Sequence, residues 1–142
     1  MELVLFDKDC DEVEVVNDEL IIRVGDFRQS FSLNKITEVD LSYNNIKSLP
    51  EFPETLLVLK CNNNELQSLP LLPKLLEELL CHSNEMSSLP ELPNQLKVLD
   101  CSRNYIQTLP KIPITLVELR CAGNDIHQLP ELPITQRIRM LW

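Results

Sequence analysis

The chain has 142 residues, of which 44% are hydrophobic, and a formal net charge of −9. This length suits one domain and is too short for two independent hydrophobic cores, and no apolar run approaches the roughly 18 residues of a membrane-spanning helix. The negative charge disfavours nucleic acid and anionic membranes as partners, because binding to either depends on Lys and Arg residues of the protein that displace counterions.

Residues 1–34 form the first predicted segment, which holds nine acidic and three basic residues. It contains four short β-rich runs, at residues 3–6, 13–16, 20–24 and 27–33. Such runs predict a β-meander, and Gly25-Asp26 between the last two fits a two-residue hairpin turn. We therefore expect a β-rich N-terminal cap.

Several acidic residues in this segment follow the spacing of a calcium-binding loop. They are Asp7, Asp9, Asp11 and Asp18. Glu12 stands where such a loop needs glycine, and the flanking residues are typical of strands. The sequence favours a solvated acidic turn over a calcium site, and no metal site is predicted.

Residues 35–135 repeat with a period of 20 residues. The pair Leu-Pro recurs five times without a slip, and a second proline follows three positions after each first one, which accounts for all ten prolines. Asparagine keeps the same period, at Asn44, Asn64, Asn84, Asn104 and Asn124. Such self-similarity predicts five stacked repeats, each of which buries its apolar face against its neighbours.

Each repeat is predicted to contain a short parallel strand. Apolar and polar side chains alternate in segments such as residues 58–62, which is typical of a strand with one buried face. The Leu-Pro-x-Leu-Pro segment cannot be helical, because proline fixes φ, lacks an N–H and pushes its predecessor toward an extended form. We predict a mainly β solenoid with a parallel concave sheet and an extended, polyproline-like convex side.

The repeat L-x-x-L-x-C-x-x-N-x-I/L-x-x-L-P-x-L-P resembles the leucine-rich repeat signature, with cysteine in place of the third leucine. The resemblance covers residues 36 to about 135. The repeat is most similar to the short repeats of secreted effectors from enteric pathogens, and similar repeats are expected in large DNA viruses. The resemblance implies a right-handed solenoid and a pathogen protein that acts on host proteins. The β-rich cap departs from the helical cap of those effectors.

Residues 136–142 form the last predicted segment. Gln136 and Arg139 stand where the repeat would place apolar side chains, and arginines then alternate with apolar residues. This pattern predicts an edge strand shifted by one residue, with Trp142 covering the last repeat.

Cysteine also keeps the period of 20, at Cys61, Cys81, Cys101 and Cys121. A straight row does not offer the tetrahedral convergence that zinc needs, and parallel Cβ vectors are poorly aimed for disulfides. We therefore predict buried, reduced thiols and a cytoplasmic, reducing location, in keeping with a first segment that lacks the features of a secretory signal. The asparagines are predicted to satisfy buried backbone groups where the chain turns.

The chain is predicted not to be an enzyme and to need no cofactor. His82 and His127 are the only histidines, and no Gly-rich phosphate loop or nucleophile motif is present. Cys81 and His82 are adjacent, but neighbouring strand positions point to opposite faces. No catalytic residue is predicted.

The outward strand positions vary between repeats, whereas the inward positions do not. This contrast favours a surface on the concave face that binds a protein or a peptide, over an ordinary solvated surface. The predicted contact residues are Val58, Lys60, Asn62, Glu78, Leu80, His82, Val98, Asp100, Arg103, Tyr105, Glu118 and Arg120.

The alternative function is structural. The acidic cap of one copy could meet Arg137 and Arg139 of another, which would give head-to-tail assembly. Without such contacts the protein is expected to be a monomer.

Overall fold

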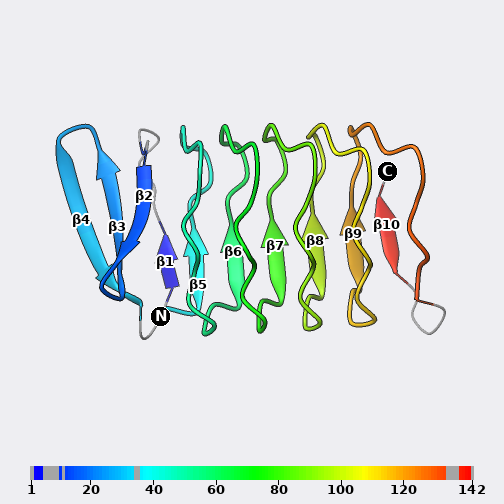
Figure 1. The fold of residues 1–142 in the computed structure, drawn as a ribbon, viewed down its shortest axis with the longest axis horizontal. Coiled ribbons are helices and arrows are strands. Elements are labelled where there is room, and N and C mark those ends of the chain that lie inside the picture. Colours follow the sequence, from blue (N-terminus) through cyan, green and yellow to red (C-terminus); the bar gives the residue numbers. More distant parts are fainter. Residues whose placement is uncertain (1, 5–9, 11, 34–35, 134–137, 142) are drawn as a thin grey trace.

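The computed structural model describes residues 2–4, 10, 12–33, 36–133 and 138–141. These residues contain ten strands in two sheets and no α-helix. The seven-stranded sheet runs along the whole molecule, and the three-stranded sheet lies at its N-terminal end (Figure 1).

The seven-stranded sheet is entirely parallel, in the order β1-β5-β6-β7-β8-β9-β10. Its strands are β1 (Glu2–Val4), β5 (Glu38–Asp40), β6 (Val58–Lys60), β7 (Glu78–Leu80), β8 (Val98–Asp100), β9 (Glu118–Arg120) and β10 (Arg139–Leu141). From β5 to β9 each residue pairs with the residue 20 positions further on, as Leu59 does with Leu79. The predicted in-register stacking of equal coils is confirmed.

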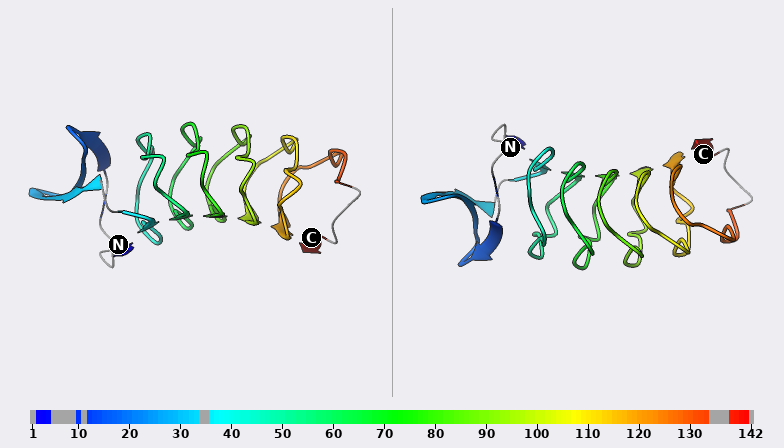
Figure 2. Two further views of the ribbon diagram at one scale, coloured as in Figure 1. Left: turned by 90° about the horizontal axis from the view of Figure 1, so that it is seen from below. Right: turned by 90° about the horizontal axis from the view of Figure 1, so that it is seen from above.

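The middle residue of each strand from β5 to β9 is buried, whereas its neighbours on either side face outward. Figure 2 shows the coils stacked along one axis, with the strands along one side. On the other side, the Leu-Pro-x-Leu-Pro segments form neither helix nor strand, as predicted. There the chain turns back toward the next strand, for example where Leu56 N–H donates to the carbonyl of Pro53 at 3.0 Å.

The asparagine ladder joins successive coils. Asn84 Nδ2 donates to the carbonyls of Cys61 and Cys81 at 3.0 and 3.1 Å, and its Oδ1 accepts the N–H of Leu66 at 3.0 Å. The side chain thus satisfies backbone groups of its own coil and of the preceding coil, in a place that is 93% hidden from water. The predicted structural role of these asparagines is confirmed.

One position of every coil adopts left-handed backbone geometry, directly after the strand segment. Its φ values lie between 53° and 67°, at Tyr43, Asn63, Ser83, Arg103 and Gly123. Only the last coil fills this position with glycine, the residue that adopts positive φ without a steric penalty.

The N-terminal cap is an antiparallel sheet in the order β2-β3-β4, formed by β2 (Glu12–Val16), β3 (Glu19–Val24) and β4 (Phe27–Ser32). Val24 pairs with Phe27, which confirms the predicted turn at Gly25-Asp26. Leu20 and Ile22 of β3 pack into the hydrophobic core of the solenoid.

One part of the meander prediction is wrong. The run at residues 3–6 was expected to belong to the cap, but β1 pairs in parallel with β5 and opens the seven-stranded sheet. The physical reason is that parallel pairing continues the stack, so that β1 covers the edge that β5 would otherwise leave open.

The C-terminal edge strand has the predicted shift of one residue. Met140 pairs with Leu119, 21 positions away, whereas paired residues of adjacent strands from β5 to β9 are 20 positions apart in the sequence. This shift puts the apolar Met140 against the core and leaves Arg139 exposed. Trp142 lies outside the described residues.

Two further sequence predictions concern metals and membranes. Asp7, Asp9 and Asp11 lie outside the described residues, and Asp18 occupies the tight turn between β2 and β3. Among the residues that the structure describes, no cluster of three or more potential metal ligands occurs. The same residues include no helix with the length and apolar character for crossing a bilayer.

Candidate interaction surface

The strand face is the side of the seven-stranded sheet on which the first and third residues of each strand point outward. Three apolar residues, Val58, Leu80 and Val98, lie near its centre around the charged Glu78, and we call these three residues the central patch. Leu80 lies diagonally between the two valines, because Val58 pairs with Glu78, and Glu78 in turn pairs with Val98. All three patch residues are half-buried, so each exposes part of an apolar side chain on a rigid support.

An ion pair borders the central patch toward the N-terminus. Lys60 Nζ lies 2.6 Å from Glu38 Oε1 on the neighbouring strand. This hydrogen bond is the main reason why the pKa of Lys60 is raised, with further support from the charge of Asp40 and against the effect of burial. The lysine is therefore charged and partly neutralised by its own chain.

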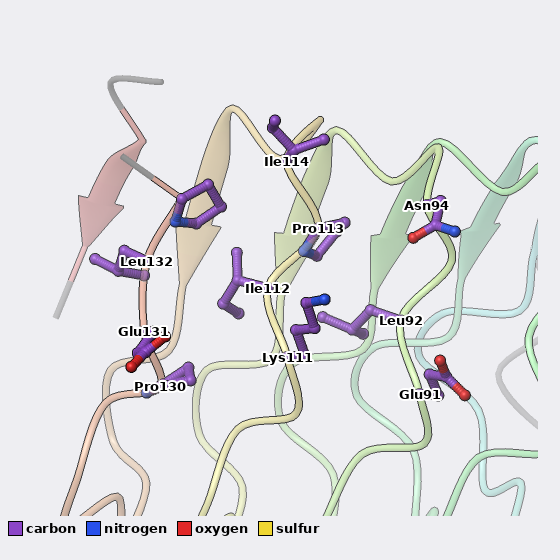
Figure 3. A pocket seen from close by; sticks show the side chains of 11 residues that line it. Glu91, Leu92, Asn94, Lys111, Ile112, Pro113, Ile114, Pro130, Glu131 and Leu132 are labelled. Carbon is purple, nitrogen blue, oxygen red and sulfur yellow. The ribbon is translucent and has the colours of Figure 1, made fainter. Parts of the chain in front are cut away.

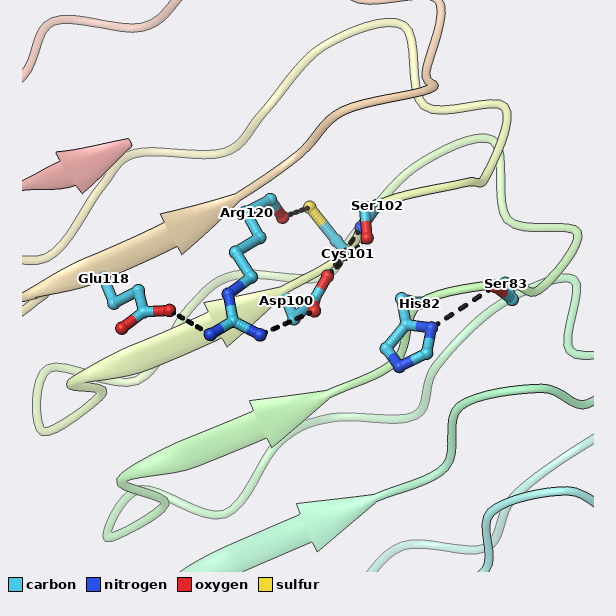
Figure 4. A network of polar contacts seen from close by, with 7 residues as sticks. All are labelled: His82, Ser83, Asp100, Cys101, Ser102, Glu118 and Arg120. Carbon is cyan, nitrogen blue, oxygen red and sulfur yellow. Dashed lines mark hydrogen bonds and ion pairs between the residues drawn. The ribbon is translucent and has the colours of Figure 1, made fainter. Parts of the chain in front are cut away.

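A second charged cluster borders the central patch toward the C-terminus (Figure 4). Arg120 Nη2 lies 2.5 Å from Glu118 Oε1, and Arg120 Nη1 lies 3.6 Å from Asp100 Oδ2. The guanidinium thus bridges two carboxylates on adjacent strands and still exposes almost half of its surface. A fixed, half-exposed arginine is a frequent anchor of protein interfaces.

Two of the predicted contact residues do not belong to this surface. Asn62 and Asp100 are each only 6% exposed. Asn62 Oδ1 accepts the hydroxyl of Ser42 at 2.9 Å, and Asp100 Oδ1 accepts both the N–H and the hydroxyl of Ser102. Their polar groups are hydrogen-bonded within the turns after the strands, and this internal use leaves little of Asn62 and Asp100 for contact with a partner.

The remaining predicted residues stay accessible. His82 follows the central strand and shares a hydrogen bond with Ser83 Oγ at 3.2 Å. Arg103 and Tyr105 project from the turn beside the strand face, where Tyr105 is 60% exposed. Glu78 forms no ion pair within the part of the chain that the structure describes and lies between Val58 and Val98, so it is the acidic group of the strand face most available to a ligand.

The cysteine ladder lies behind the strand face and is buried. Burial raises the pKa of Cys61 and of Cys101 to about 12, and it raises the pKa of Cys81 well above the usual value. Because the thiolate is the nucleophile and the metal ligand, these thiols are held in their inert form. The prediction that the four repeated cysteines are buried is confirmed.

A groove on the proline side was not predicted from the sequence (Figure 3). Leu92, Ile112 and Leu132 from three successive coils lie along it, and Lys111 stands between Glu91 and Glu131 of the neighbouring coils. Ile114 is exposed at its rim, at a position where the earlier coils carry Glu54, Lys74 and Asn94. That break in an otherwise polar column is the signal from which the groove could have been found.

Comparison with known proteins agrees with this architecture. The Leucine Rich Repeat family model matches residues 35–57. No match was found among curated protein sequences. The solved structures that resemble the chain include YopM from Yersinia enterocolitica, with 35% identity over 71% of this chain and a TM-score of 0.68.

Two further solved structures are similar. The leucine-rich repeat domain of a Shigella effector has 37% identity over 78% of this chain and a TM-score of 0.69, and YopM from Yersinia pestis has 37% identity over 68% and a TM-score of 0.66. The present chain spans 23%, 52% and 28% of the Y. enterocolitica, Shigella and Y. pestis chains, respectively. Its repeats are leucine-rich repeats of the short type found in these enterobacterial effector proteins.

Proposed function

We propose that the chain is a non-enzymatic protein-interaction module that binds a partner on its strand face. The observation that carries this proposal is the central patch, three half-buried apolar side chains that surround Glu78 on the sheet and are bordered by two ion-paired clusters. Leucine-rich repeat domains of this kind typically serve as interaction domains, which supports a binding role. As in the effectors that it resembles, the partner would be a protein of a host cell.

The dimensions of the strand face limit what it can hold. The strands from β5 to β9 span about 20 Å, and the three residues of each strand cover about 10 Å along its axis, which gives a surface of a few hundred Å². A standard interface buries about 800 Å² on each partner. The ligand is therefore an extended segment or a protruding loop rather than the flat face of a domain.

The charges of the strand face indicate the chemistry of the ligand segment that it would bind. Glu78 is available within the central patch, whereas Lys60 and Arg120 are already paired with carboxylates of the chain. The net charge of −9 also attracts basic partners. We expect an apolar side chain over Leu80, flanked by Lys or Arg near Glu78.

A displayed library of random peptides tests this proposal. Peptides are selected on the wild-type chain and counter-selected on the variant Leu80→Ala/Tyr105→Ala/Arg120→Ala. A matched control replaces three exposed residues outside the strand face, Leu71→Ala/Lys111→Ala/Ile114→Ala.

The expected peptides carry an apolar residue next to basic residues and lose at least tenfold in affinity on the strand-face variant, which should keep the circular dichroism spectrum of the folded wild type. The control variant should bind them as the wild type does. Equal affinity for the wild type and the strand-face variant would reject this site.

Head-to-tail assembly has less support. Arg139 is exposed on the terminal strand, but Arg137 lies outside the described residues. The three-stranded cap lies beyond β1 along the solenoid axis, in the direction from which the terminal strand of another copy would approach (Figures 1 and 2). This placement argues against pairing of β10 of one copy with β1 of the next, and leaves the charge contact between the cap and the terminal strand as the form that head-to-tail assembly would take.

A further inference from the structure

The outer strand of the cap has an open edge. Among the residues that the structure describes, β4 pairs only with β3, and every residue of β4 is exposed except Phe31, which is half-buried. Proteins commonly protect such edges with several charges, prolines or bulges. β4 carries a single charged residue, Arg28, and no proline. Its edge is therefore available for pairing with another strand.

The hydrogen bonds of the hairpin show which backbone groups face this edge. Val24 and Phe27 close a two-residue turn, and the N–H of Leu33 donates to the carbonyl of Asp18 at 2.9 Å. In an antiparallel pair, alternate residues exchange hydrogen bonds with the partner strand. The odd-numbered residues of β4 therefore bond to β3, and the N–H and C=O groups of its even-numbered residues point outward.

The side chains of β4 add an apolar element on one face. Phe27 and Phe31 pair with Val24 and Leu20 of β3, on the face of the cap that packs against the solenoid core. Phe31 contacts that core, whereas Phe27 is 81% exposed. In Figure 2, β4 extends away from the coils of the solenoid.

β4 is complementary to a second copy of itself. Because the outward groups belong to even-numbered residues, an antiparallel pair must join even-numbered to even-numbered residues. Pairing Arg28 with Ser30 of the second copy places each Phe27 opposite a Phe31 and places the two Gln29 side chains opposite each other. Pairing Arg28 with Arg28 would instead bring like charges together, which destabilises a sheet. Pairing Ser30 with Ser30 would set Phe31 opposite Gln29 and lose the aromatic pairs.

We propose that β4 is a dimerisation edge, at which a second copy of this chain adds its own β4 across a two-fold axis to form a six-stranded sheet. The added strand lies outside the coils, because β4 is the strand farthest from them (Figure 1). Unlike head-to-tail contacts, this isologous contact closes on itself and stops at the dimer. The dimer carries two strand faces, which raises the avidity for a ligand that presents two copies of its binding segment.

The contact is small, which sets the strength of the dimer. Each phenylalanine can bury about 150–250 Å², so the pair of strands stays below the roughly 800 Å² per partner of a standard interface. We therefore expect a reversible dimer with a Kd of about 1–100 µM.

Sedimentation equilibrium of the wild-type chain between about 2 and 200 µM tests the dimer. The average mass should rise from that of the monomer toward twice that value. Ser30→Pro removes an outward N–H without a loss of hydrogen bonds to β3, and proline is tolerated at such an edge position. This variant should remain a monomer, whereas the matched control Ser30→Ala, which keeps the N–H, should dimerise. A wild-type chain that stays monomeric throughout, or a Ser30→Pro variant that dimerises equally, would overturn the proposal.

Two further variants test the fold and the register. Phe27→Lys changes a side chain that is 81% exposed, so it should keep the wild-type circular dichroism spectrum and lose the dimer. Gln29→Cys places two thiols opposite each other at a Cα separation of about 4.5 Å, within reach of a disulfide. Mild oxidation should give covalent dimers of Gln29→Cys and not of Arg28→Cys or Ser30→Cys. Crosslinking of either of the latter two in its place would contradict the proposed register.

Discussion

The N–H of Cys10 donates to Asn44 Oδ1 at 3.1 Å, in the same way as the N–H of Ile46 donates to Asn64 Oδ1 at 3.0 Å. The carbonyl of Cys10 in turn accepts the N–H of Asn45, as that of Ile46 accepts the N–H of Glu65. Cys10 therefore occupies the position of Ile46 in a coil that precedes the first full repeat. The strand β1 supplies the sheet of that coil, so the chain begins its stack with half a repeat and then inserts the cap.

The substitution Asn44→Ala tests this junction. It removes the acceptor of the Cys10 N–H and leaves a buried donor unsatisfied, which costs about 1–3 kcal/mol. The Cys10 amide should then exchange its hydrogen at least about fivefold faster, as measured by hydrogen exchange under native conditions. Asn104→Ala, three coils away, serves as the control and should leave the exchange rate of Cys10 unchanged unless global unfolding limits it. Equal rates in wild type and Asn44→Ala would contradict the half-repeat.

The solenoid could be predicted from the sequence because its period is enforced by packing. A strict repeat of 20 residues leaves one register in which Leu59, Leu79 and Leu99 share a core, and any slip would expose all of them at once. The same logic predicted the shift in β10, because only a shift by one residue places Met140 opposite Leu119.

The half-repeat was missed because the cap separates its two ends. Cys10 and Ile36 enclose the three-stranded sheet, whereas Ile46 and Leu56 at the equivalent positions are only ten residues apart. A usable signal was present, since Leu3 precedes Cys10 by the same seven positions as Val39 precedes Ile46. A search for single spacings, rather than for complete repeats, would have found it.

The candidate site was only partly predictable, for a local reason. Strand alternation indicates which face a residue occupies, and it correctly placed Leu80 and Arg120 on the strand face. It does not indicate whether a polar group is used by the chain itself. Asp100 accepts hydrogen bonds from Ser102, and Asn62 accepts one from Ser42. These contacts depend on the conformation of the turns after the strands.

The asparagine ladder should contribute more at its centre than at its end. Asn84→Ala leaves the buried N–H of Leu66 without its acceptor and removes one of the two side-chain donors from each of the carbonyls of Cys61 and Cys81, so we expect a loss of up to about 3 kcal/mol in unfolding free energy. Asn124 is half-buried, so that water can replace part of its contacts, and Asn124→Ala should cost about 1 kcal/mol. Urea denaturation measures both values. Similar losses for the two variants would show that burial does not decide their contribution.

The left-handed position of each coil predicts opposite effects on stability for two substitutions, Gly123→Ala and Arg103→Gly. Gly123 has a φ of 67°, and a Cβ built on it would lie 3.5 Å from Arg103 Cα, which is an ordinary contact. Gly123→Ala should therefore destabilise the chain through its backbone alone, by about 1 kcal/mol. Arg103→Gly at the equivalent position should be neutral or stabilising by up to about 1 kcal/mol, since relief of the left-handed strain outweighs the added flexibility of the unfolded chain. Thermal denaturation of both variants checks this; a marked loss of stability in Arg103→Gly would contradict it.

The buried thiols make stability depend on pH in the alkaline range. An unfolded cysteine has a pKa of about 8.5, whereas burial raises the pKa of Cys61 and Cys101 to about 12 in the folded chain. Between these values the unfolded chain binds fewer protons than the folded one, so the unfolding free energy falls as the pH rises, by up to about 1.4 kcal/mol per pH unit for each thiol. The double variant Cys61→Ala/Cys101→Ala lacks these two titrations. It should be less stable than the wild type near neutral pH and should lose stability less steeply between about pH 8.5 and 10.5, as followed by urea denaturation. Other titrating groups are common to both chains, so two parallel pH profiles would mean that the thiols are not protected from ionisation in the folded state.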